Sequence, residues 1–262
     1  MTSPDKQTSI TIEKRGQVDW LTFNRPEALN ALTPDMADEI ADYFSGLVND
    51  KSVRVVVMRG AGRAFCAGLD VKAHLASDGA VNGINRLPEI VRDMRRCPQP
   101  VIALVHGAAC GGGFAFALAS DLRIAGESMK MNDAFVKLGV SGCELGVTYN
   151  LPRIVGASVA RELMYTGNFI GAERAERVGL VSSVVPDDAL ESEGERLAAD
   201  MIRIAPMALR KTKQTFNELC DVDDFEQVVQ REGEVQVECM QGPDFDEGLR
   251  AFAEKREPNF SG

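Results

Sequence analysis

The sequence predicts an α/β protein that ends in a layer of helices. Short runs rich in β-branched residues alternate with helical patterns along most of the 262 residues, an order typical of a parallel sheet covered by helices. Two of these runs, Val53–Met58 and Val101–Val105, have the composition of strands that are buried on both faces. From about Ala189 onward the pattern is helical with a break at Pro206, so we expect the last helices to form a separate layer.

Two local patterns define the N-terminal elements. Ile10–Lys14 and Val18–Phe23 alternate between apolar and polar residues on either side of a short turn, which predicts a β-hairpin. Thr33 then has the character of an N-cap, Pro34 suits the first helical position, and Asp35 suits the positive end of a helix dipole. We therefore expect a helix to begin directly after Thr33.

Both buried strands lead into glycine-rich loops. The first is followed by "RGAGRAFCAGLD" and the second by "HGAACGGG". An apolar helix is expected from about Gly113 to Ala119, and Leu122–Ala125 and Leu180–Val185 predict two further strands. Because ligands in open α/β folds bind beyond the carboxyl ends of strands, we expect the two loops to share one site.

The triple glycine has no side chain that could react, so its chemistry would come from the backbone. Free N–H groups of Gly111 to Gly113 at the start of a helix, together with the helix dipole, favour a developing negative charge. A tight turn that packs a buried helix against a strand is the structural alternative. The spacing matches neither a phosphate-binding loop of the Walker type nor a dinucleotide fingerprint.

The composition and net charge of the chain exclude some classes of binding partner. A net charge of −10 and a pI of about 4.9 argue against nucleic acid and anionic membranes. The sequence shows no apolar signal core near Met1 and no run of about 18 apolar residues that would predict a membrane span. The six cysteines are scattered and read as free thiols of a reducing, cytoplasmic compartment. With only His74 and His106 available, no metal site is expected.

Four motifs carry a resemblance to a known family. In order along the chain they are "NRPEALNAL", "GRAFCAGLDV", "VHGAACGGG" and "GLRAFAEKREPNF". The chain resembles the enoyl-CoA hydratase/isomerase (crotonase) family from Asn24 almost to its C-terminus. The resemblance implies a spiral of ββα units over residues 1–205 and a helical trimerisation region over 206–262. It also implies an acyl-CoA thioester substrate, with coenzyme A as part of the substrate and no separate cofactor, and a homotrimer or dimer of trimers.

The same resemblance assigns roles to particular residues. The backbone amides of Leu69 and Gly112 would form an oxyanion hole for an enolate, where one donor is typically worth ~2.7–4 kcal/mol. Lys255 would reach a coenzyme A phosphate from a neighbouring subunit, and Lys72 could do likewise, although both lysines also suit a solvated surface. The residues that would line the adenine and pantetheine path are Ala28, Ala67, Asp70 and Val71.

The chain departs from the family where the acids are expected. The two positions that hold glutamates in the family's hydratases are Ala115 and Phe135 here. Glu144, eight residues before Pro152, is similar in placement to an acid of family members of the dienoyl-CoA isomerase type. Its neighbours offer little solvation, which predicts a raised pKa and a catalytic acid/base. Alternatively, the spacing from Ser141 to Glu144 suits a capping box before a helix.

These residues favour double-bond isomerisation of an enoyl-CoA with Glu144 as the single acid/base. Hydration, with Glu144 acting on water, is the main alternative within the family. A catalytically silent acyl-CoA-binding paralogue is a second alternative, favoured by Phe114 and Phe135 in place of a polar neighbourhood. A hydrolase or lyase of the same superfamily stays open as well, because the sequence carries no mark that identifies the acyl group.

Overall fold

The main sheet contains both the first and the last strand that the structure describes, one at each edge. The computed structural model describes residues 8–76 and 86–261, so the expected domain limits at residues 1 and 262 lie outside the described residues. Within the described part, the sheet has the strand order β1-β2-β3-β4-β6-β9. The hairpin of β1 and β2 is antiparallel and the later pairs are parallel. The bounds are β1 (Ile10–Arg15), β2 (Val18–Phe23), β3 (Val55–Gly60), β4 (Val101–Val105), β6 (Leu122–Gly126) and β9 (Ser183–Val185).

A second, small sheet gives the fold its repeat. It consists of β5 (Ala108–Cys110), β7 (Lys130–Asn132) and β8 (Ile170–Gly171) in the order β5-β7-β8. Cys66 bridges to Ala109, and Ala109 pairs in parallel with Met131. Three successive turns of chain therefore each place one segment in the main sheet and one in the small sheet, and a helix follows. This is the expected spiral of ββα units.

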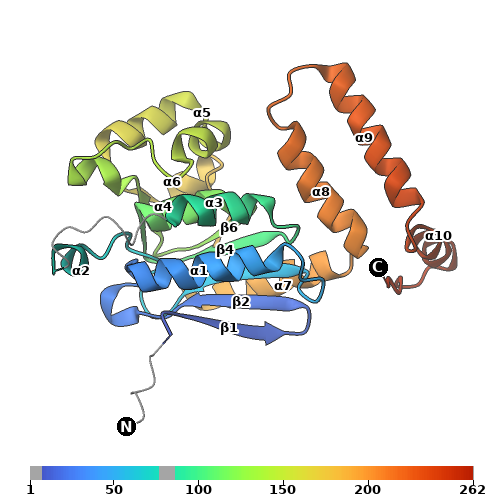
Figure 1. Cartoon of the computed structure of the whole chain (residues 1–262), viewed down its shortest axis with the longest axis horizontal. Coiled ribbons are helices and arrows are strands. Elements are labelled where there is room, and N and C mark those ends of the chain that lie inside the picture. The colour runs from blue at the N-terminus through green and yellow to red at the C-terminus, as the bar shows by residue number, and fades with distance from the viewer. Residues whose placement is uncertain (1–7, 77–85, 262) are drawn as a thin grey trace, which may run out of the picture.

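Helices cover both faces of the main sheet. In Figure 1, α1, α3 and α4 lie over one face and α7 lies against the other. Alternate residues of β3 follow this division, because Val56 and Met58 belong to the larger apolar core while Val55 and Val57 pack with the α7 side. The bounds are α1 (Pro34–Leu47), α2 (Val71–Ala76), α3 (Leu87–Arg96), α4 (Gly112–Ala119), α5 (Val147–Thr166), α6 (Ala172–Arg177) and α7 (Leu190–Ile202).

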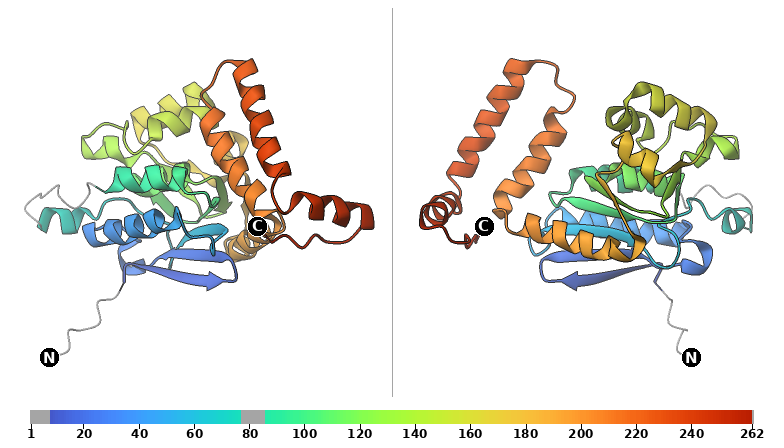
Figure 2. Two further views of the ribbon diagram at one scale, coloured as in Figure 1. Left: turned by 45° about the vertical axis from the view of Figure 1, so that its right-hand side comes forward. Right: turned by 180° about the vertical axis from the view of Figure 1, so that it is seen from behind.

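The last three helices extend away from the sheet (Figures 1 and 2). They are α8 (Pro206–Leu219), α9 (Phe225–Met240) and α10 (Phe245–Glu254). A buried lysine on α8, Lys213, fastens this arm to the core: its Nζ donates to the carbonyls of Met94 and Gln99, at 2.8 Å each, and pairs with Asp121 at 2.8 Å. Among the described helices, none is long and apolar enough to cross a bilayer.

Most expected elements are present, with differences at the short strands. The hairpin is confirmed, as are the strand Val101–Val105 and the Thr33 cap, whose Oγ1 accepts from the N–H of Met36 at 3.3 Å. The strand expected at 180–185 begins only at Ser183, because Leu180 closes the turn after α6 with its N–H on the carbonyl of Ala175. The strands of the small sheet, two or three residues each, were too short for their alternation to be detected.

Candidate active site

The glycine turn connects β5 to α4 in a space that only glycine fits. A Cβ on Gly113 would lie 2.2 Å from the carbonyl oxygen of Cys66, so α4 starts in direct backbone contact with the loop that follows β3. A Cβ on Gly68 would lie 2.7 Å from the carbonyl oxygen of Cys110 and 3.7 Å from the nitrogen of Gly112. The two glycine-rich loops are therefore adjacent, as expected from the sequence.

The backbone N–H groups of Leu69 and Gly112 are among those in these loops that have no acceptor within the described residues. Leu32 donates its N–H to Gly68 at 2.7 Å, and Asp70 donates its N–H to Leu32 at 3.0 Å. Because N–H groups alternate in direction along an extended segment, the N–H of Leu69 points away from Leu32. Gly112 is the first residue of α4, where helix N–H groups lack intrahelical partners. Among the described residues, neither the Leu69 nor the Gly112 N–H donates a hydrogen bond.

The surroundings of Gly112 make its N–H a stronger electrostatic donor. Residues 111–118 are all buried, and α4 carries no charged side chain. The positive end of the helix dipole is therefore screened little by water. An oxyanion placed at this helix start would be stabilised by fixed backbone dipoles, which need no side chain.

Glu144 lies in the loop before α5, close to the glycine turn. The next residue, Leu145, has its Cδ1 4.0 Å from the position of a Cβ on Gly112. The Glu144 side chain is exposed, and its Oε1 accepts from the N–H of Leu145 at 3.3 Å. The expectation of a poorly solvated carboxyl is therefore wrong for the single chain, because the loop turns this side chain outward.

The capping-box interpretation of Glu144 is also wrong. The N-cap of α5 is Gly146, at φ 78°, and no side chain caps this helix. The hydroxyl of Ser141 instead accepts from the N–H of Cys143 at 3.0 Å, within the loop. The carbonyl of Glu144 accepts from the N–H of Val147 at 2.9 Å, but its carboxyl does not cap α5.

The two positions that lack glutamates are filled by apolar side chains. Ala115 is fully buried in the first turn of α4. Phe135 is half-buried, and its ring edge lies 3.8 Å from the position of a Cβ on Gly111. No carboxylate therefore replaces the missing glutamates at these two positions, and Glu144 is the acid in the loop beside Gly112.

The residues predicted to contact acyl-CoA lie together near α2. One of them, Asp70, already has hydrogen-bonding partners within the protein. Ala67 donates its N–H to the carbonyl of Leu29 at 3.0 Å, which brings the segment of Ala28 beside the loop. Val71 is 42% exposed at the start of α2. Asp70 pairs with Arg25 at 2.9 Å and accepts from the N–H of Ala73 at 3.0 Å, so its carboxylate already has structural partners.

The charge state of Asp70 follows from those partners. Partial burial acts to raise the pKa of Asp70, but the hydrogen bonds from Ala73 and Arg25 outweigh it, so its pKa lies below the usual value. Asp70 is thus held as a carboxylate that caps α2 and fixes Arg25.

Lys255 is not near the other predicted residues within one chain. It ends α10, is exposed, and has φ 53°. In Figure 1, α10 and α2 lie at opposite ends of the molecule. Lys72 is exposed on α2 itself. Any contact of Lys255 with a ligand held by Leu69 and Gly112 therefore needs a second copy of the chain.

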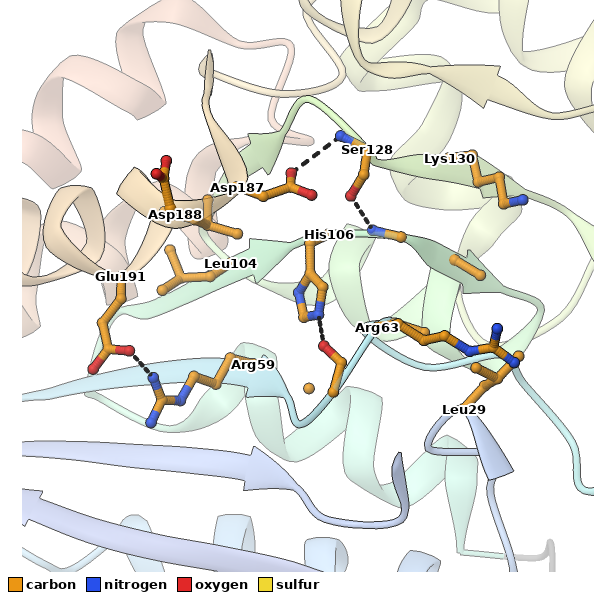
Figure 3. Close-up of a pocket in the computed structure, with 16 residues that line it drawn as sticks. Leu29, Arg59, Arg63, Leu104, His106, Ser128, Lys130, Asp187, Asp188 and Glu191 are labelled. Atoms are coloured by element: carbon orange, nitrogen blue, oxygen red, sulfur yellow. Dashed lines mark hydrogen bonds and ion pairs between the residues drawn. The ribbon is translucent and has the colours of Figure 1, made fainter. Parts of the chain in front are cut away.

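A pocket of about 770 Å³ is lined by the loop that follows β3, the end of β4 and the start of α7 (Figure 3). Leu69, Gly112 and Glu144 do not line it. Part of its polar lining is bonded internally: the Nε2 of His106 lies 2.8 Å from the carbonyl of Gly62, and the hydroxyl of Ser128 accepts from the N–H of Gly107 at 3.0 Å. These hydrogen bonds join successive turns of the spiral, which indicates a structural role for these residues.

The sequence carried no functional signal for Asp133, which is fully buried between β7 and the Glu144 loop. It stands in the short stretch "KMNDAF", which has no periodicity of its own. Only the fold brings its carboxyl beneath a residue 9 positions further along the chain, Gly142.

The chain is similar to known proteins both in sequence and in fold. The family described as enoyl-CoA hydratase/isomerase matches residues 13–262. The chain is 37% identical over 257 residues to a protein of Mycobacterium tuberculosis named "Probable enoyl-CoA hydratase EchA12", covering 94% of this chain and 90% of the relative. It is 36% identical over 255 residues to the short-chain-enoyl-CoA hydratase of Clostridium acetobutylicum, with 95% of both chains covered. The crystal structure of an enoyl-CoA hydratase from Bacillus anthracis superimposes with a TM-score of 0.92 at 32% identity, covering 97% of this chain and 99% of that one.

Proposed function

The chain belongs to the enoyl-CoA hydratase/isomerase family of enzymes, and we propose that it moves a double bond in an enoyl-CoA thioester. One observation carries the proposal. Two unpaired amides, Leu69 and Gly112, lie in adjacent loops, while Glu144 is the acid next to Gly112 and positions 115 and 135 are apolar. A site with one acid suits a proton that is removed and then returned.

The proposed mechanism uses backbone and side chain in sequence. The thioester oxygen accepts hydrogen bonds from the Leu69 and Gly112 amides, which stabilise the enolate oxygen when the proton leaves. Glu144 takes the proton from one carbon, the electron pair moves along the conjugated system, and the same carboxyl protonates the other end. Removal of one such donor typically lowers kcat by about 10²–10³-fold.

Hydration is the second candidate, and two observations favour it. The relatives from Mycobacterium tuberculosis and Clostridium acetobutylicum both carry the name of a hydratase. Glu144 is also exposed, so water can reach its carboxyl. In this version Glu144 takes a proton from water as the hydroxide attacks the β-carbon, and the two amides hold the enolate. The same carboxyl then returns the proton to the α-carbon.

We also propose that the chain works as a homotrimer or dimer of trimers, with residues 206–262 as the region of assembly. The arm exposes large apolar side chains that nothing in the single chain covers within the described residues. They are Phe216, Phe225, Met240, Leu249 and Phe252. Lys255 would then meet the acyl-CoA of a neighbouring copy. Light scattering after gel filtration tests this arrangement, and a monomer would contradict it.

The reaction is tested by proton exchange in deuterated water. Wild type, Glu144→Gln and a matched surface control, Glu173→Gln on α6, are incubated with 2-enoyl- and 3-enoyl-CoA thioesters. Deuterium at the α- and γ-carbons and addition of water are followed by mass spectrometry. We expect exchange in wild type and the control, and a loss of about 10²–10⁴-fold in Glu144→Gln, the usual contribution of a positioned base.

The product separates the candidates. Deuterated isomer without added water supports isomerisation, whereas a 3-hydroxyacyl product supports hydration. Wild type that binds the thioesters but exchanges no proton would overturn both and leave a silent acyl-CoA-binding protein.

A further inference from the structure

Asp133 is a buried acid that is poorly paired within the described residues, with only the nearby N–H of Phe135 acting on its carboxyl. It follows β7, its side chain is 0% exposed, and neither carboxyl oxygen accepts a hydrogen bond of good geometry within the described residues. It precedes the short 3₁₀ helix Ala134–Leu138 without capping it. Buried carboxyl groups are normally paired, because burial without a partner costs several kcal/mol. The position of this group therefore needs an explanation other than local stability.

The carboxyl lies directly beneath the loop that carries Glu144. A Cβ on Gly142 would come within 2.6 Å of the Oδ2 of Asp133 and 3.1 Å of the carbonyl oxygen of Met164. Gly142 is therefore seated on the carboxyl, beside the C-terminal part of α5. Any other residue at position 142 would push the loop and the acid apart.

The loop is held down at two points, and Glu144 lies between them. From residue 139 to residue 146, only Gly142 and Leu145 are buried. Gly142 rests on Asp133, while Leu145 packs close to Gly112 at the start of α4. The position of Glu144 relative to the glycine turn therefore depends on two contacts, a polar one between Gly142 and Asp133 and an apolar one between Leu145 and Gly112.

We propose that Asp133 is a positioning residue, whose carboxyl supports Gly142 and so fixes Glu144 relative to the Leu69 and Gly112 amides. The inference rests on the proposed function only in taking Glu144 as the acid. Asp133 touches no reacting atom and acts through the loop.

The groups around Asp133 offset its charge only in part. Burial raises the pKa of Asp133 to about 6, although the nearby N–H of Phe135 lowers it in part. Hydrogen bonds with Thr148 and Ser141 lower the pKa of Cys143, and the nearby Asp133 acts against them. The 3₁₀ helix contributes the exposed Lys137. The end of α5 contributes the carbonyl of Met164. A protonated Asp133 can donate to a carbonyl, so the support is firmest below about pH 6.

The experiment compares four variants: Asp133→Ala, Asp133→Asn, Gly142→Ala and the double variant Asp133→Ala/Gly142→Ala. The rate of α-proton exchange is resolved into kcat and KM, and amide hydrogen exchange of the 139–146 peptide reports the loop itself. For each single alanine variant we expect kcat to fall about 10–10²-fold, as for an acid displaced by about 1 Å, with little change in KM.

The double variant and the conservative variant make the proposal specific. Removing the carboxyl makes room for the methyl group, so the double variant is expected to be no slower than the worse single variant. Asp133→Asn keeps the shape and is expected to lose less activity than Asp133→Ala. It should also remove the loss of loop protection, measured relative to the intrinsic exchange rate at each pH, that we expect in wild type above about pH 6. Asp19→Asn, at an acid 3% exposed in β2, is the control and should leave loop exchange unchanged.

Additive losses in the double variant, or loop exchange equal to wild type in Asp133→Asn and Asp133→Ala, would overturn the proposal. A wild type with no α-proton exchange would instead contradict the proposed function. The loop peptide would still decide whether Asp133 supports Gly142, so the two failures are distinguishable.

Discussion

The glycine turn is packed on all sides within one chain, whereas the helical arm leaves large apolar side chains exposed. Around Gly111–Gly113 the backbone is buried on all sides, and neighbouring loops touch at distances that exclude a side chain. On the arm, by contrast, Phe216 is 72% exposed and Phe252 is 86% exposed. The amides that would bind an enolate are thus placed by a single chain, whereas the arm presents apolar surface suited to another copy.

The largest effect is expected from adding one methyl group to the turn. Gly113→Ala places a Cβ against the carbonyl of Cys66, so we expect the free energy of unfolding to fall by about 4 kcal/mol or more and activity to be lost. The matched control is Gly233→Ala within α9, where a Cβ meets nothing within 4 Å. That change should stabilise the helix by roughly 0.5–1 kcal/mol. Urea unfolding of both variants checks this, and similar losses at the two sites would contradict it.

The next largest effect is expected at the junction between the two regions. Lys213→Met removes the buried cation that pairs with Asp121 and satisfies two carbonyls, and should cost roughly 3–5 kcal/mol of unfolding free energy. Lys211→Met on the same helix breaks a more exposed pair with Glu238 and should cost at most about 1 kcal/mol. Denaturant midpoints measure both, and equal costs would show that Lys213 does not fasten the arm.

One acid in each region should make the free energy of unfolding depend on pH, and the two dependences should have opposite signs. The pKa of Asp133 is about 6 in the folded chain against 3.8 ordinarily, so its folded form retains a proton that the unfolded chain releases. Stability should therefore fall as pH rises from about 4 to about 6, by up to roughly 3 kcal/mol. Asp133→Asn should flatten this slope when unfolding midpoints are measured across pH.

Glu247 on α10 is the acid of the arm. Its hydrogen bonds from Arg256 and Asn259 lower the pKa of Glu247 to about 2. Its contribution is present above its ordinary pKa of 4.5 and is lost as pH falls toward about 2. Glu247→Gln should therefore affect unfolding at neutral pH but not in strong acid. An equal effect at both pH values would contradict this sign.

The smallest effect on the stability of a single chain is expected from the exposed phenylalanines. Phe252→Ser should change the free energy of unfolding at high dilution by less than about 0.5 kcal/mol, because the ring has few partners within its own chain. Its effect should appear instead in the mass measured by light scattering. An unchanged mass together with a destabilised chain would show that the arm is completed internally.

Much of the core could be predicted from the sequence because its signals are local. The Thr33 cap, the first hairpin and the strand Val101–Val105 depend on neighbouring residues, and all are present. The adjacency of the two glycine-rich loops followed from the order of the strands. The exposure of Glu144 did not, because it depends on how Gly142 packs on Asp133 and Leu145 packs near Gly112, which the local sequence does not encode.

The prediction for Lys255 depends on a second copy of the chain. The sequence predicts a contact from a neighbouring subunit, and the fold, which puts α10 and α2 at opposite ends of one chain, is consistent with that expectation without testing it. Asp133 escaped notice because an isolated acid in "KMNDAF" is usually a surface residue.

The unpaired N–H groups of Leu69 and Gly112 belong to the main chain, and this has a consequence for natural variation. A substitution at Leu69 changes the side chain but leaves the donor in place, so a scan of point mutations would pass over one half of the site. Only changes that bend the backbone, such as a Cβ forced against Leu32 from position 112, would reach it. Under the proposed function, a change of the acid beside this pair of amides would alter the reaction while leaving the proposed oxyanion hole in place.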